Sequence, residues 1–205
     1  MEWPQRRTTH RSDAIHLAIR QVSALQAAPV GGDWCDAFVQ GEDQTLVIGD
    51  VAGHDATAAR AMIRLRRLLR RVAADTTHGA GPAALLTAVD TAMTTQGVGI
   101  LTTAIVARLT RPPDAHAWLL RWSNAGHPPP VLVDGDGLVN TLVTPPDRPL
   151  GIGSDRPRSE AELVLQLGTT LILHGRPGRT TPAGRRRRDQ VALDRPDRSG
   201  ATRAQ

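Results

Sequence analysis

The sequence of this 205-residue chain predicts an α+β fold, in which antiparallel strands form a sandwich that helices flank. Segments whose apolar residues alternate with polar or small ones stand before and after a central region, as expected for half-buried strands. In the central region the apolar residues recur every three or four positions, which indicates two amphipathic helices. Strands grouped on either side of a helix pair favour antiparallel sheets over a parallel α/β sheet.

The first half of the chain follows these periods in order. Strands are expected at residues 15–19, 37–39 and 45–48. A helix is expected over 55–74, with an apolar face made of Ala58, Met62, Leu65, Leu69 and Val72. A second helix is expected to begin at Gly81-Pro82, because proline suits the first turn of a helix. Its apolar face comprises Leu85, Leu86, Val89 and Met93.

The second half returns to strand patterns. Strands are expected at residues 99–109, 117–123, 131–133, 138–142, 163–167 and 169–173. Residues 124–130 end in three prolines and are expected to form a loop, since each proline fixes φ and removes a backbone donor. The sequence Asp134-Gly135-Asp136-Gly137 predicts a hairpin turn between two of the strands.

Charge divides the chain into a domain and a tail. The formal charge is +5 and the pI is about 11.1. Residues 176–205 hold nine of the 25 basic and three of the 20 acidic side chains, a net of +6 that leaves −1 for the rest. We expect a loose segment over 1–14, a C-terminally incomplete domain over 15–173 and a disordered, arginine-rich tail over 174–205. All basic residues except histidine are arginines, which indicates a GC-rich gene.

Several protein classes are excluded or disfavoured. Cys35 is the only cysteine, so an internal disulfide cannot form. The N-terminus lacks the apolar core of a secretory leader, and no apolar run approaches the roughly 20 residues of a membrane span. We therefore expect a soluble, cytoplasmic protein without a membrane partner.

Two aspartates framed by glycines are expected at strand ends. Asp33 lies in Gly31-Gly32-Asp33-Trp34, and Asp50 lies in Gly49-Asp50-Val51-Ala52-Gly53-His54. Mg²⁺ and Mn²⁺ prefer oxygen ligands, and neighbouring glycines let backbone carbonyls and water approach the same ion. Taken singly, aspartates beside glycines are ordinary turn residues. Together, the two motifs indicate half of a metal site.

With Asn124-Ala125-Gly126-His127-Pro128-Pro129, these motifs resemble the metal-dependent (PPM-type) serine/threonine protein phosphatases in order and spacing over roughly residues 15–173. The closest resemblance is to their bacterial SpoIIE-like branch, which dephosphorylates regulators of alternative sigma factors. The resemblance implies a β-sandwich with two Mn²⁺ or Mg²⁺ ions at one end. Asp50 would bridge both ions, Asp33 would hold one, and the carbonyl of Val51 would contribute. Water activated by the ions would attack a phosphoserine or phosphothreonine directly.

The resemblance also implies later metal-binding aspartates, which the sequence lacks at the expected place. The family has a Tyr-Thr-Asp-Gly-Leu-Val-Glu type segment after its last core strand, whereas this chain reads Leu173-His174-Gly175-Arg176-Pro177-Gly178-Arg179-Thr180. Codons for these eight residues, read one nucleotide later, can spell the family's segment. We therefore hypothesise a frameshift within or just before Leu173, with residues 174–205 translated out of frame. The tail's Asp189, Asp194 and Asp197 lack a strand-end setting.

Other residues have competing interpretations. His54 is a candidate general acid, although a histidine at a helix start commonly caps or packs locally. His127 is expected to shape a loop near the site, and Cys35 to be structural. Asp36 is left open between a supporting role and a solvated one. The arginines of 64–71 are expected to form a solvated helix face, and those of 185–188 are not expected to bind nucleic acid, because neither aromatics nor a fold surround them.

These observations lead to competing functions. The first is a Mn²⁺- or Mg²⁺-dependent phosphoprotein phosphatase that acts on a bacterial signalling partner, such as an anti-sigma-factor antagonist. The alternative is a pseudophosphatase that keeps the sandwich and serves as a protein-binding module. A nucleic-acid binder acting through the tail is a third reading. The number of carboxylates that converge on the metal site discriminates between the first two.

Overall fold

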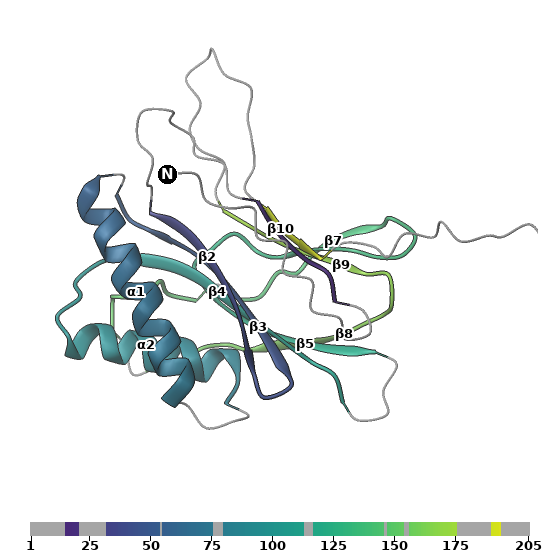
Figure 1. Cartoon of the computed structure of the whole chain (residues 1–205), viewed down its shortest axis with the longest axis horizontal. Helices are drawn as coiled ribbons and strands as arrows, with labels where there is room; N and C mark the ends of the chain where they lie inside the picture. The colour runs from purple at the N-terminus through teal and green to yellow at the C-terminus, as the bar shows by residue number, and fades with distance from the viewer. Residues whose placement is uncertain are drawn as a thin grey trace, which may run out of the picture.

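Two five-stranded antiparallel sheets pack face to face, and two helices cover the outer face of one of them (Figure 1). The computed structural model describes residues 15–20, 32–53, 55–75, 80–112, 117–145, 147–153, 156–175 and 190–193. The elements in chain order are β1 Leu17–Arg20, β2 Asp33–Gln40, β3 Asp43–Val51, α1 Ala56–Asp75, α2 Pro82–Thr95, β4 Thr102–Thr110, β5 Trp118–Ala125, β6 Val131–Val133, β7 Val139–Thr141, β8 Ala161–Leu165, β9 Thr170–His174 and β10 Gln190–Leu193. The predicted α+β sandwich is confirmed.

The sheet beneath the helices has the strand order β2-β3-β4-β5-β8. Its central strands are buried on both faces, because alternate residues supply two separate cores. On β3, Leu46 and Ile48 face the second sheet, whereas Val47 faces the helices. On β4, Ile105 faces the second sheet, whereas Ala104 faces the helices. Burial on both faces explains why these strands are nearly continuous apolar runs.

The two helices start where local sequence signals place them. At the start of α1 the Asp55 carboxylate accepts hydrogen bonds from the N–H groups of Thr57 (3.0 Å) and Ala58 (2.9 Å). Such a cap satisfies backbone donors that have no partner within the helix. Gly81 precedes α2, and Pro82 opens it, as predicted. Neither described helix is both long and apolar enough to cross a membrane.

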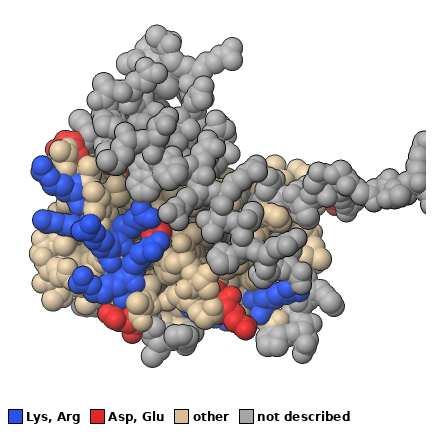
Figure 2. Space-filling model, viewed as in Figure 1, with Lys and Arg blue, Asp and Glu red and all other residues tan. Residues whose placement is uncertain are grey.

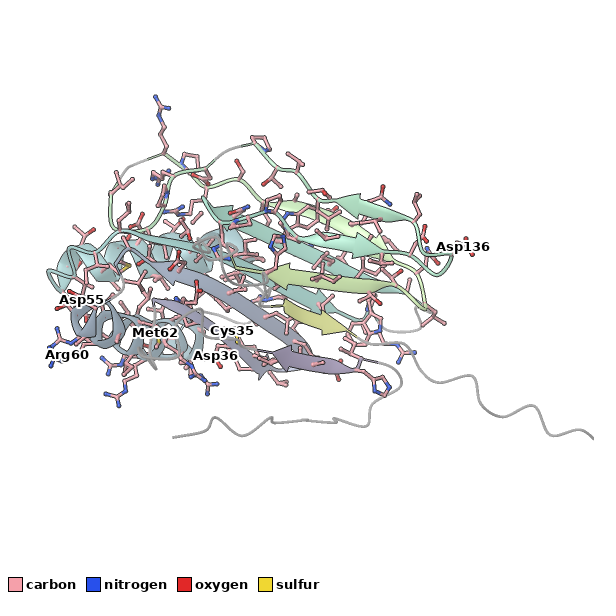
Figure 3. All side chains as sticks on the ribbon, turned by 90° about the horizontal axis from the view of Figure 1, so that it is seen from above. Cys35, Asp36, Asp55, Arg60, Met62 and Asp136 are labelled. Atoms are coloured by element: carbon pink, nitrogen blue, oxygen red, sulfur yellow. The ribbon has the colours of Figure 1, made fainter. Side chains whose placement is uncertain are left out.

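The second sheet has the order β1-β10-β9-β6-β7. Leu171 and Leu173 of β9 are buried against the first sheet. The β6–β7 hairpin turns where the sequence predicts, and Asp134 Oδ1 accepts the N–H groups of Asp136 (3.0 Å) and Leu138 (2.9 Å). Figure 3 places this turn, marked by Asp136, at the opposite end of the sandwich from Asp55.

The segment predicted to be disordered contains a strand. Residues 190–193 form β10, which lies between β1 and β9 and pairs with both in antiparallel register. The prediction is therefore wrong for these four residues. It rested on composition, and composition does not report that two distant strands each offer an unpaired edge for backbone hydrogen bonds. Residues 176–189 and 194–205, like the predicted loose segment 1–14, lie outside the described residues.

A buried ion pair that the sequence did not predict anchors the segment between β7 and β8. Arg158 Nη2 lies 2.7 Å from Asp90 Oδ2 of α2, and both side chains are almost fully buried. The second oxygen of Asp90 accepts the N–H of Gly151 at 2.8 Å, and Arg158 Nη1 donates to the carbonyl of Arg148. Leu150, between them, exchanges two backbone hydrogen bonds with Thr102 of β4. The segment is thereby fixed to the helix layer and to β4.

Candidate metal centre

The two predicted ligand aspartates are direct partners across neighbouring strands. Asp33 is the first residue of β2 and pairs with Asp50 near the end of β3, which in turn pairs with Thr103 of β4. Side chains directly opposite one another in an antiparallel pair lie on the same face of the sheet. Ile48, two residues before Asp50, faces the second sheet. Asp33, Asp50 and Thr103 therefore line one end of the layer between the sheets.

Glycine at position 32 keeps backbone and carboxylate oxygens accessible beside these aspartates. The Val51 N–H donates to the Gly32 carbonyl at 3.1 Å, which holds the two segments together. A Cβ at Gly32 would collide with the Val51 carbonyl oxygen and lie 3.1 Å from Asp50 Oδ1. The space left by glycine thus borders both oxygens. This arrangement fits the expected contribution of the Val51 carbonyl to a metal site.

Gly175 occupies the place from which a third carboxylate would reach the aspartates. It follows β9, whose Leu171 and Leu173 face the layer between the sheets, and the same alternation directs position 175 inward. A Cβ at Gly175 would lie 3.6 Å from Asp33 Oδ1 and 3.9 Å from Oδ2. In the hypothesised reading frame, the aspartate of the family's segment would fall on this position. Glycine offers no ligand there.

The donor set therefore suits a divalent ion only in part. Asp33, Asp50 and the Val51 carbonyl are hard oxygen donors of the kind that Mn²⁺ and Mg²⁺ prefer. Within the described ranges, no group of three or more His, Cys, Asp and Glu side chains is arranged to hold a metal ion. An ion held by the three donors would supply Lewis acidity to a phosphoryl group and lower the pKa of a bound water. A second ion would need further ligands.

The loop around His127 forms a wall next to the aspartates. The Asn124 side chain donates to the His127 carbonyl and accepts its N–H, both at 2.8 Å. His127 is buried, and its Nδ1 lies 2.9 Å from the Thr103 hydroxyl, beside Asp50 in the register. The motif thus builds a fixed corner of the site. Asn124 and Ala125 belong to β5 instead of the predicted loop, because they still pair with or border β4.

The remaining candidates lie elsewhere or outside the described residues. His54, the candidate general acid, is one of the residues outside them. Cys35 packs, half-buried, against the core between the sheets. Asp36 is buried on the opposite face of β2, toward α1, so it does not line the metal centre. The sequence predicts solvated arginines over 64–71, whereas Arg66 and Arg70, one helical turn apart, both bind Asp36.

Asp36 links β2 to α1 through both arginines. Its carboxylate accepts hydrogen bonds from Arg66 Nε at 3.1 Å and from Arg70 Nε and Nη2, each at 2.6 Å. Burial by itself raises the pKa of this carboxyl group, but the hydrogen bonds and charges of Arg70 and Arg66 outweigh it and hold the pKa below its ordinary value. The carboxylate is therefore ionised at neutral pH.

Replacing Asp36 with asparagine is expected to lower the free energy of unfolding by about 2 kcal/mol at pH 7, because charge-assisted hydrogen bonds are lost. A depressed pKa stabilises the fold above the unfolded-state value of about 4, and this stabilisation is lost as the pH falls through the folded-state value. Urea denaturation of both proteins between pH 3 and 7 (about the range of carboxyl titration) measures the difference in their free energies of unfolding. This difference should become smaller below about pH 4. A difference that does not change with pH would contradict an ionic link between Asp36 and the arginines.

Most of the chain also matches a protein-family model. The profile of the SpoIIE family, described as Stage II sporulation protein E, matches residues 40–175, which include Asp50, Val51 and the His127 loop. The chain belongs to the SpoIIE family. The SpoIIE-family match ends at Gly175, the residue beside Asp33.

Solved structures resemble this SpoIIE-family domain over most of its length. The RsbU and RsbW domains of Rv1364c from Mycobacterium tuberculosis match with 30% identity and a TM-score of 0.67, over 81% of this chain and 46% of that one. The PP2C phosphatase domain of SpoIIE from Bacillus subtilis matches with 18% identity and a TM-score of 0.63, over 79% and 45%. RsbX in complex with magnesium matches with 13% identity and a TM-score of 0.61, over 80% and 75%. The chain spans about half the length of the first two.

Proposed function

We propose that this SpoIIE-family domain hydrolyses phosphoserine or phosphothreonine in a protein partner, with Mn²⁺ or Mg²⁺, and that this chain does so slowly. The observation that carries the proposal is the pairing of Asp33 and Asp50 across β2 and β3, with the Val51 carbonyl beside them. Fewer carboxylates weaken divalent-ion binding. Because Gly175 stands in the place of a third carboxylate, we expect the metal ion to occupy the site only in part and turnover to be slow.

The family supports a phosphoprotein of sigma-factor regulation as substrate. One matched structure, 30% identical to this chain, contains RsbU and RsbW domains. We propose that the substrate is a cytoplasmic regulator of that kind, such as an anti-sigma-factor antagonist. In hydrolysis the chain's own part would be to hold the ion through Asp33 and Asp50 and to keep one side of the site fixed through His127 and Thr103.

The same glycine favours a second candidate, a pseudophosphatase that binds a partner without turnover. The two-sheet core and the helix layer do not depend on the missing carboxylate, since both cores consist of apolar side chains. A protein-binding role therefore survives the loss of a metal ligand. Turnover, in contrast, depends on the number of ligands.

A phosphoserine-peptide assay with Mn²⁺ separates the candidates. We expect slow phosphate release that EDTA abolishes and that Asp50→Asn lowers at least about tenfold, because half of the carboxylate pair is lost. Glu162→Gln, at an exposed ion pair 3.4 Å long on the β5–β8 edge, is the control and should match wild type. Release that survives Asp50→Asn would contradict the metal centre, and no release from any of the proteins would contradict the proposed hydrolysis and favour the pseudophosphatase.

A further inference from the structure

Four exposed arginines form a stripe along α1, on a surface distinct from the metal centre. Figure 2 shows basic side chains gathered over this part of the molecule, and Figure 3 shows Arg60 pointing away from the sheets. The stripe consists of Arg60, Arg64, Arg67 and Arg71, whose spacing of four, three and four residues places them on one helix face. It is about 16 Å long, at a rise of about 1.5 Å per residue.

The stripe arginines differ from the other two arginines of α1. Arg66 and Arg70 bind Asp36 and so serve the attachment of α1 to β2. Among the residues that the structure describes, the stripe arginines have no ion-pair partner. Outside the tail the chain is almost neutral, so this face concentrates positive charge that the fold itself does not use.

A pocket of about 280 Å³ opens beside the stripe. Arg64, Arg67 and Arg71 line it together with Gln96 and three apolar residues, Leu65, Leu68 and Val98. Leu65 and Leu68 are buried members of the core beneath α1. The pocket therefore combines a basic rim with an apolar floor, and no acidic side chain among the described residues lines it.

We propose that this stripe and pocket bind an acidic segment of a partner protein, with one apolar side chain in the pocket and carboxylates on the arginines. An extended segment of about five residues spans the stripe, at about 3.3 Å per residue. Guanidinium groups pair with carboxylates through matched hydrogen bonds. The apolar floor favours a peptide over nucleic acid, and α1 carries no aromatic side chain on which a base could stack.

The test titrates the full chain into a fluorescently labelled peptide and measures the fluorescence anisotropy of the peptide. The peptide has a central leucine flanked by glutamates. EDTA is present throughout, so the result does not depend on the metal centre or on phosphatase activity. Combined Arg64→Gln, Arg67→Gln and Arg71→Gln should weaken binding about tenfold, the sum of several exposed ion pairs. The matched control, Arg111→Gln, Arg121→Gln and Arg156→Gln, removes the same charge elsewhere and should leave binding within about twofold of wild type.

Further arms separate this surface from general attraction of anions. Replacing the glutamates of the peptide by glutamines should abolish binding, and replacing its leucine by serine should weaken it. Equal losses of peptide affinity in the two triple variants would overturn the proposal. Unchanged affinity in both variants would also overturn it, and would indicate that the peptide binds the arginines of the tail. A single-stranded oligonucleotide that binds the stripe more tightly than the peptide would overturn it as well. Thermal melts of the variants should match wild type, because the stripe arginines are exposed.

Discussion

Replacing Gly175 with aspartate is expected to tighten Mn²⁺ binding about tenfold or more and to raise phosphatase turnover in proportion to the occupied fraction. The new carboxylate would extend from a Cβ that lies 3.6 Å from Asp33 Oδ1, in ordinary contact and without a clash. Gly175 has no positive φ, so an aspartate fits the backbone. Isothermal titration with Mn²⁺ measures the affinity, and phosphate release from a phosphoserine peptide measures the turnover.

Two variants show whether the gain comes from metal ligation. Gly175→Asn has nearly the same size without the charge and should reproduce little of the gain. Asp50→Asn combined with Gly175→Asp should lose most of it, because both side chains would bind one ion. Equal affinity of Gly175→Asp and wild type for Mn²⁺ would show that position 175 does not reach the ion, and would contradict the geometry of the site.

Replacing Asp90 with alanine is expected to lower the free energy of unfolding by about 3 kcal/mol, since the buried Arg158 guanidinium would lose its short contact with Asp90 and keep only the longer one with Asp147, at 3.8 Å. The side chain of Arg158 is fully buried, and that of Asp90 is 6% exposed, so water cannot solvate the Arg158 guanidinium in place of the lost carboxylate. The N–H of Gly151 would also lose its acceptor. Guanidinium denaturation followed by circular dichroism measures the effect.

The matched control is the exposed pair Arg121–Glu162, whose nitrogen and oxygen lie 3.4 Å apart. Glu162→Gln should change stability by less than about 1 kcal/mol, because solvent screens exposed ion pairs. Combined Asp90→Leu and Arg158→Met removes both charges and should recover much of the stability lost in Asp90→Ala. If Asp90→Ala and Glu162→Gln had equal effects, the buried pair would not anchor the segment.

Local patterns predicted most of the elements and part of the site. Short, apolar-rich segments located β3 and β4, and the period of Ala58, Leu65 and Leu69 located α1. Gly81-Pro82 placed the start of α2. Each of these signals acts between near neighbours in the chain, through backbone conformation or through the face on which a side chain lies. The neighbouring glycines likewise mark Asp33 and Asp50 as a pair in the sequence alone.

Other features depend on segments far apart in the sequence. Composition predicted a disordered tail, yet residues 190–193 complete a sheet between β1 and β9. The role of Asp36 stayed open, since it faces α1 only because β2 presents alternate residues to opposite layers. The hydrogen bonds of Gly151 and Arg158 with Asp90 join positions more than 50 residues apart, and no local pattern indicates them.

The sequence by itself determined the order of strands and helices as far as β9, the glycine-framed aspartates and the absence of an aspartate after the last predicted strand. Periodicity, turn chemistry and motif order contain that information, because they act over a few residues. Only the tertiary structure decided that Asp33 and Asp50 face each other in register and that Gly175 lies beside them. It also decided which arginines of α1 bind Asp36 and which form the exposed stripe. These relations depend on how the strands align and how α1 lies on the sheet, which no single segment specifies.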